Sequence, residues 1–108
     1  MAFTTIQRDI LAHTDEDTGA TIHAKVLGAD EWLRYQQTLY SIDQQSVSAY
    51  VKLRMDFGKE WITRLKGYQF DDGALLTLDD VGLLPPALIL AVHDAVLEHI
   101  SVKKSNEE

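Results

Sequence analysis

The stretch DQQSVSAYVKLRMDFGKEWITRLKG, residues 43–67, carries the strongest structural signal in this chain. Its large apolar residues return every three or four positions, which is the period of one face of an α-helix. Gly67 closes the stretch, and glycine is common just beyond the last turn of a helix. The pattern therefore predicts a long helix that ends next to Gly67. The residues assigned to its stripe are Val47, Tyr50, Val51, Arg54, Phe57, Trp61, Ile62 and Leu65.

Arg54 is the charged member of this stripe. Its aliphatic stem can lie along an apolar surface while the guanidinium group reaches water. A charge at this position is therefore compatible with a helix that packs on its neighbours.

Two more helices are predicted on either side of the long one. The stretch GADEWLRYQQTLYSI, residues 28–42, contains Asp30, whose carboxylate can cap a helix start. A last helix begins near Pro86, because proline fits the first turn, where no intrahelical N–H is needed. The apolar stripes comprise Trp32, Tyr35, Leu39 and Ile42 in the first helix, and Leu88, Ile89, Val92, Val96 and Ile100 in the last.

Residues 8–27, RDILAHTDEDTGATIHAKVL, contain two short runs with partial alternation around a polar turn. Gly19 ends that turn and can adopt the positive φ that hairpin loops often require. We therefore predict a β-hairpin before the helices. The expected fold is mainly α with a small N-terminal β-hairpin (α+β), a compact single helical domain over residues 1–102 with a polar tail at 103–108.

The composition narrows the possible functions. The 108 residues include 45% hydrophobic and 25% charged side chains, the balance of one globular domain. A net charge of -7 disfavours nucleic acid and anionic membranes as partners. The chain has no cysteine, which excludes disulfides and thiolate sites. No apolar run is long enough to cross a bilayer, and the first residues lack a signal-peptide pattern, so we expect a cytoplasmic protein.

The acidic residues suggest turns rather than metal or catalytic sites. Asp15, Asp17 and Gly19 resemble the start of a calcium loop, but the twelfth position is Val26 instead of glutamate. A second acidic group follows the long helix, in DDG and TLDD. These motifs are typical of a turn and of a capped helical start, with Thr77 and Asp80 in the capping positions. Asp71, Asp72 and Asp79 complete this group.

The histidines give no complete site either. His93 and His99 are six residues apart, which separates them by about 240° around a helix. His13 and His23 flank the hairpin turn, and a pair without a carboxylate is weak support for a metal site. We therefore expect no enzyme activity, no catalytic residues, no cofactor and no bound metal.

Aromatic residues concentrate in the two central helices. A small domain must bury most of them, but tryptophan and tyrosine are also frequent anchors of protein interfaces. We therefore expect a partner surface on these helices. The candidate partner-binding residues are Trp32, Tyr35, Tyr40, Tyr50, Phe57 and Trp61.

The order of these segments resembles a known family. A hairpin leads to VLGADEW, residues 26–32, and two aromatic-rich helices are followed by WITRLKGYQFDDGALLTLDDVGLLPPALILAVHDAV, residues 61–96. This arrangement resembles the small tail assembly chaperones of long-tailed phages and prophages, in which a segment like RLKGYQFDDGALLTL precedes a final helix. The resemblance extends from about Ile22 to Ile100 and rests on this pattern.

The resemblance implies a non-enzymatic protein of the host cytoplasm that is not retained in the mature virion. Such a chaperone binds the long, helical tape measure protein and keeps it soluble until the tail-tube protein polymerises around it. The tail-tube protein is then a possible second partner, and homo-oligomers are possible. Two alternatives stay open: an acidic inhibitor or immunity-type protein that binds a basic nucleic-acid-processing protein, and another small phage head-tail morphogenesis protein.

Overall fold

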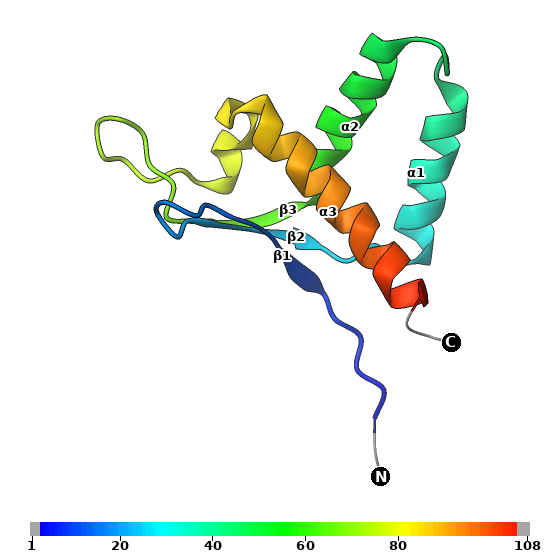
Figure 1. The fold of residues 1–108 in the computed structure, drawn as a ribbon, viewed down its shortest axis with the longest axis horizontal. Helices are drawn as coiled ribbons and strands as arrows, with labels where there is room; N and C mark the ends of the chain where they lie inside the picture. The colour runs from blue at the N-terminus through cyan, green and yellow to red at the C-terminus, as the bar shows by residue number, and fades with distance from the viewer. Residues whose placement is uncertain (1–2, 106–108) are drawn as a thin grey trace.

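The computed structural model describes residues 3–105, which form a small antiparallel sheet with helices on one side (Figure 1). The strands lie in the order β1-β2-β3, so the middle strand pairs with both neighbours. The α+β class predicted from the sequence is confirmed. The elements are β1 (Asp9–Thr14), β2 (Thr21–Lys25), α1 (Ala29–Ser41), α2 (Val47–Trp61), β3 (Ile62–Lys66), the 3-10 helix η1 (Leu78–Leu83) and α3 (Pro86–Ser105).

The predicted N-terminal hairpin is β1 and β2. Asp15 organises its turn, because the carboxylate accepts hydrogen bonds from the backbone N–H groups of Asp17 and Thr18. Gly19 adopts a φ of 77°, as the turn requires. These bonds also hold the pKa of the Asp15 carboxyl below its ordinary value.

The predicted end of the long helix is wrong. α2 ends at Trp61, and the next five residues form β3, which adds a third strand to the expected hairpin. Ile22 and Ala24 of β2 face Leu65 and Ile62 of β3, so non-local pairing determines the backbone conformation there. Gly67 does have a positive φ of 86°, but it follows a strand instead of a helix.

The apolar stripe of α2 also differs from the prediction in its first half. Val47 is 77% exposed, Tyr50 43% and Val51 37%. Leu53, which lies outside the predicted stripe, is 4% exposed and belongs to the core. Within α2 the predicted stripe is correct at Phe57 and Trp61, which are buried in the core.

The core lies where α2 and α3 meet above the sheet. Its largest fully buried side chains include Trp61, Ile22, Ile89 and Val92. At the contact between α2 and α3, Gly58 lies so close to Ile89 that an added Cβ would be 2.6 Å from the Ile89 carbonyl oxygen. A glycine therefore lets the two helices approach.

The segment between β3 and α3 is a connector that contains the turn and the capped helical start indicated by the sequence. The Asp72 carboxylate accepts a hydrogen bond from the Ala74 N–H, and Gly73 has a φ of 92°. Before η1, the Thr77 backbone N–H donates to the Asp80 carboxylate at 2.9 Å. Asp72 and Asp80 thus stabilise the turns of this connector.

The last helix begins at Pro86, as predicted, and buries Ile89, Val92 and Val96. It runs further than expected, because α3 includes residues 103–105 of the predicted polar tail. Residues 106–108 of that predicted tail lie outside the described chain.

Candidate functional site

The six aromatic residues expected to bind a partner divide into two equal groups. Tyr35, Phe57 and Trp61 are 2%, 5% and 0% exposed, so they lie in the core of this chain. Trp32, Tyr40 and Tyr50 are exposed. Only the second group can contact a partner without a change of conformation.

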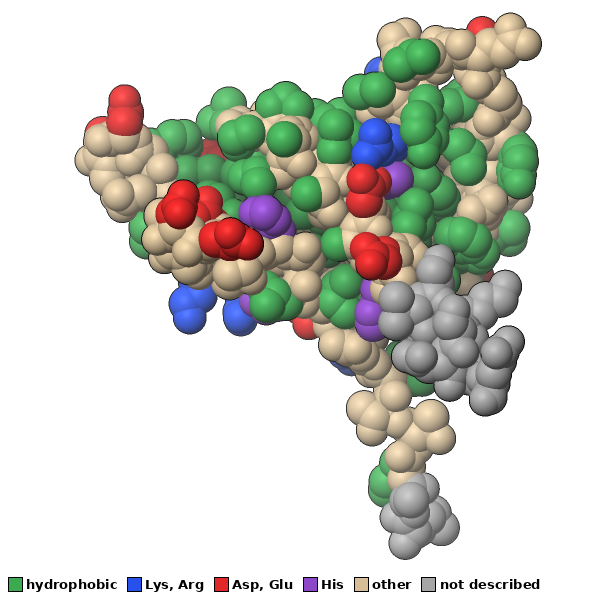
Figure 2. Space-filling view, viewed as in Figure 1, with side chains coloured by type: hydrophobic (Ala, Val, Ile, Leu, Met, Phe, Trp, Pro, Cys, Tyr) green, Lys and Arg blue, Asp and Glu red, His purple; other side chains and the backbone are tan. Residues whose placement is uncertain are grey.

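Exposed apolar residues accumulate on the hairpin of α1 and α2. Leu33, Val47 and Val51 join the three exposed aromatic residues there, and all six are between 37% and 77% exposed. Hydrophobic side chains are visible over both helices in Figure 2. We call this set the helical-hairpin surface: Trp32, Leu33, Tyr40, Val47, Tyr50 and Val51.

The buried aromatic residues form one cluster with His93, whose ring contacts Tyr35 and Trp61. The ring of Tyr35 lies 5.0 Å from that of Phe57 and 5.4 Å from that of Trp61, measured between centroids. Trp61 stacks on the His93 ring at 5.5 Å, with an angle of 9° between the planes. His93 itself is only 1% exposed. Side chains from α1, α2 and α3 thus meet at one aromatic cluster.

A chain of polar contacts passes through this cluster. Tyr35 Oη lies 2.8 Å from His93 Nε2, and His93 Nδ1 lies 2.8 Å from Asp94 Oδ1. Arg54 donates to both carboxylate oxygens of Asp94, at 2.8 and 2.9 Å. An ionised Asp94 can only accept, so His93 carries its proton on Nδ1, and its Nε2 accepts a hydrogen bond from the Tyr35 hydroxyl.

The protonation of the network follows from its burial. Desolvation lowers the pKa of His93 below its ordinary value, although the hydrogen bond to Asp94 opposes this shift. Burial raises the pKa of Tyr35 to about 12. Desolvation would raise the pKa of Asp94, but the hydrogen bonds from His93 and Arg54 and the charge of Arg54 lower it overall. At neutral pH the tyrosine and histidine are neutral, and the aspartate is charged.

This Tyr–His–Asp arrangement joins helices. A general base must come within hydrogen-bond reach of its substrate. The tyrosine and the histidine are both buried, so a substrate in solution cannot reach them in this conformation. Arg54, which was expected to extend its guanidinium into water, instead connects α2 to Asp94 on α3. The network therefore positions the three helices relative to one another.

Sequence reasoning missed this network, although part of its signal was present. His93 follows Ile89 by four residues and precedes Val96 by three, which places it on the buried stripe of its helix. Arg54 stood in the stripe of the preceding helix. A charged residue and a histidine on two facing apolar stripes could have indicated a buried polar contact, but Tyr35 as the third partner could not be identified.

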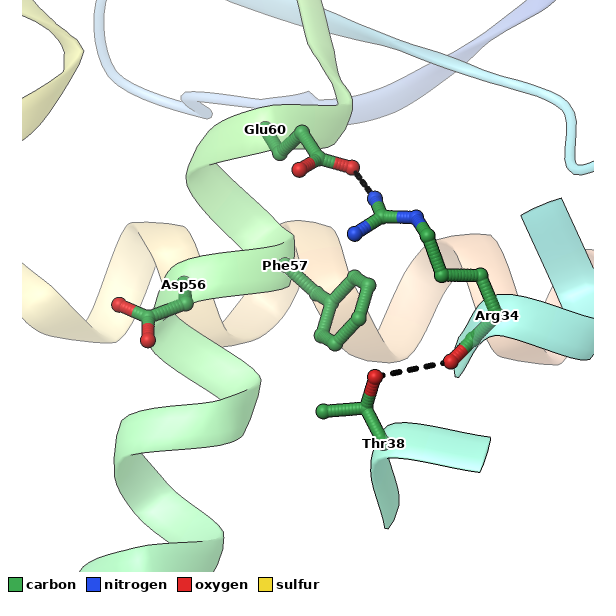
Figure 3. Close-up of a pocket in the computed structure, with 5 residues that line it drawn as sticks. All are labelled: Arg34, Thr38, Asp56, Phe57 and Glu60. Carbon is green, nitrogen blue, oxygen red and sulfur yellow. Dashed lines mark hydrogen bonds and ion pairs between the residues drawn. The ribbon is translucent and has the colours of Figure 1, made fainter. Parts of the chain in front are cut away.

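A small pocket lies at the seam between α1 and α2 (Figure 3). Arg34 pairs with Glu60 across the seam and lies over the ring of Phe57, with its guanidinium carbon 4.9 Å from the ring centre. Thr38 and Asp56 complete the lining, and Asp56 points away from the other side chains. The volume of about 210 Å³ is below the roughly 300–1,000 Å³ that is usual for small-molecule sites.

No arrangement for a metal is present in the part of the chain that the structure describes. His13 and His23 lie on the paired strands β1 and β2, where His23 is opposite Leu11 and His13 opposite Ile22. Among the described helices, none is long and apolar enough to cross a membrane.

Several acidic side chains are already paired within the chain. Glu31 contacts Lys25, Asp56 contacts Lys52, and Asp94 contacts Arg54. Such pairing interrupts the continuous acidic face that a nucleic-acid mimic would present.

Comparisons with family models, with curated proteins and with solved structures each find no match to this chain.

Proposed function

We propose that this chain is a non-enzymatic chaperone that binds a long helical partner through the helical-hairpin surface. The observation that carries the proposal is the exposure of six large apolar side chains on one pair of helices, in a domain that has a separate buried core. Large exposed apolar areas are typical of protein interaction sites. Exposed Trp and Tyr residues add the amphipathic anchors that such interfaces favour.

The proposed partner is a phage tape measure protein, in keeping with the sequence resemblance to tail assembly chaperones. Amphipathic helices bind through apolar anchors spaced along one face, which a helical-hairpin surface can contact. The net charge of -7 would keep a complex with an apolar chain soluble. The tail-tube protein is a further proposed partner, and the host cytoplasm is the proposed location.

Co-expression with the tape measure protein encoded beside this chain tests the proposal. We expect the tape measure protein to be soluble and to co-purify with the wild-type chain. Replacing three exposed residues of the surface, Tyr40→Ser, Val47→Ser and Tyr50→Ser, should reduce co-purification about tenfold or more while the fold is retained, since several apolar anchors are lost.

A matched control variant carries Leu75→Ser and Leu83→Ser. These residues are 69% and 68% exposed, but they lie in the connector and η1, outside the helical-hairpin surface. The control should co-purify like the wild type. An insoluble tape measure protein with the wild-type chain would contradict the proposal, and binding of basic nucleic-acid-processing proteins would then be tested next.

A further inference from the structure

Helix α1 is attached to the rest of the protein through very little buried surface. Of its 13 residues, all of which the structure describes, only Tyr35 is buried. Gly28 occupies its N-cap position and has no side chain to satisfy the first N–H groups. Its ion pairs, the exposed Arg34 with Glu60 and the partly buried Lys25 with Glu31, both remain in contact with solvent and contribute little. Tyr35 is therefore the one buried anchor of this helix, and the partly buried Leu39 adds a second contact with the core.

The surface beneath α1 belongs to a firmer unit. Phe57 and Trp61 come from α2 and His93 from α3, and these two helices are in close contact at Gly58 and Ile89. Residues 26–28 and 42–46 connect α1 to its neighbours. Detachment of α1 would thus leave both the sheet and the contact between α2 and α3 in place.

This covered surface has an unused hydrogen-bond donor. Trp61 is fully buried, yet its Nε1–H has no acceptor among the described residues. A buried donor without a partner costs free energy, and a ligand that supplies an acceptor would recover it. Trp61 Nε1 is therefore a buried donor that the fold leaves unsatisfied.

We propose that α1 is a displaceable lid, and that the face formed by Phe57, Trp61 and His93 binds an amphipathic helix of the partner in its place. The chemistry of the guest follows from Tyr35 of α1: an aromatic residue that packs on the cluster and a hydroxyl that reaches His93 Nε2. This inference rests on the proposed function, because it gives the same helical partner a second contact in addition to the helical-hairpin surface. Proteins commonly draw their moving elements from their least stable parts.

A peptide with the sequence of residues 28–44 provides a probe that is independent of the tape measure protein. We expect the labelled peptide to bind the full chain, and Tyr35→Phe in the chain to strengthen binding about tenfold, because its own lid is then held more weakly. Tyr35→Phe in the peptide should weaken binding. Hydrogen exchange should also be about tenfold faster in α1 than in α2 and α3.

The absence of cysteine allows the lid to be locked. Arg34→Cys with Glu60→Cys, joined by a short bis-maleimide, would tie α1 to α2 and should abolish peptide binding. Lys52→Cys with Asp56→Cys is the matched control, since it replaces an exposed ion pair and ties α2 only to itself. The control should bind the peptide like the wild type.

Three results would overturn the lid. They are peptide binding that survives the lock, no binding by any form, and exchange in α1 as slow as in α3. A bridge that joins residues 34 and 60 of two copies would assign the site to a second copy instead of a separate partner. If the tape measure protein is still solubilised when the lid test fails, the proposed function stands and only the lid is wrong.

Discussion

The two ends of α2 show how differently one helix can be used. Its C-terminal half, from Leu53 to Trp61, is packed against α3, and Gly58 brings the two backbones together. Its N-terminal half exposes Val47, Tyr50 and Val51. The helix that precedes this half in the chain is α1, which is weakly anchored. The comparison teaches that stability and binding are separated along the chain: one half supports the fold, and the other is free to contact a partner.

The largest expected effect on stability comes from a comparison of the two tryptophans, Trp61 on α2 and Trp32 on α1. Trp61→Ala should lower the free energy of unfolding by about 3–5 kcal/mol, because a fully buried ring is lost and a cavity remains. Trp32→Ala should lower it by less, about 1–2 kcal/mol, since Trp32 is 40% exposed although its ring stacks on Tyr35. Urea unfolding followed by circular dichroism measures both. Equal effects of the two substitutions would remove the distinction between the two regions.

The glycine at the contact of α2 and α3 gives the next largest effect. Gly58→Ala should destabilise by about 1–3 kcal/mol, because the new Cβ would be 2.6 Å from a backbone oxygen that cannot move alone. Gly82→Ala is the control, since nothing lies within 4 Å of the position of its Cβ. Thermal unfolding of both variants is the measurement. A Gly58→Ala protein as stable as the wild type would mean that the helices are not held so closely.

Local chemistry explains which parts of the fold could be predicted from the sequence. Pro86, the Asp72–Gly73 turn and the Thr77–Asp80 pair act through neighbouring residues, and each was identified correctly. Residues 62–66 continue the helical pattern of the preceding residues, yet they form a strand. Their conformation depends on pairing with β2, which no local signal reveals. Three of the six residues expected at the partner surface are buried, which the sequence did not reveal because helical period alone does not say which face meets α3.

The contacts around His93 could not be predicted from local sequence patterns, because they join residues that are far apart in the chain. Arg54 and Asp94 are forty residues apart, and their pairing requires the observed approach of α2 to α3. Tyr35 and His93 are further apart still, at fifty-eight residues. The lid could not be inferred from the sequence, because the weak anchoring of α1 is visible only when the burial of each residue is known. The partner and the chaperone activity stay predictions.

Removing one hydroxyl should sharpen the comparison between the anchored helices and α1. Tyr35→Phe should cost about 1–2 kcal/mol, because His93 Nε2 would stay buried without its donor. Tyr40→Phe is the matched control, since Tyr40 is 76% exposed. Hydrogen exchange should show the loss mainly in α1. A loss spread evenly over α1, α2 and α3 would indicate that α1 unfolds only together with the rest.

Acidification should have the smallest effect on the free energy of unfolding, and this effect should arise from protonation of His93. The groups that face its ring are Tyr35 from α1, Arg54 from α2 and Asp94 on its own helix, while Trp61 stacks on it. Burial lowers the pKa of His93 in the folded state, whereas in the unfolded chain it returns to about 6.5. The unfolded state therefore binds the proton more readily. This stabilisation is complete above about pH 6.5 and is lost as the pH falls from there toward the lower pKa of the folded state.

Protonation of His93 also places an N–H against the Tyr35 hydroxyl, which must then accept instead of donate. The effect should thus be felt first at α1, the less stable of the two regions. Urea unfolding between about pH 7.5 and about pH 5 should show a free energy of unfolding that decreases with acidity. His93→Gln removes the titrating group, so its stability should depend less on pH over this interval. An unchanged dependence in His93→Gln would show that other groups are responsible, and that the link between His93 and α1 does not respond to pH.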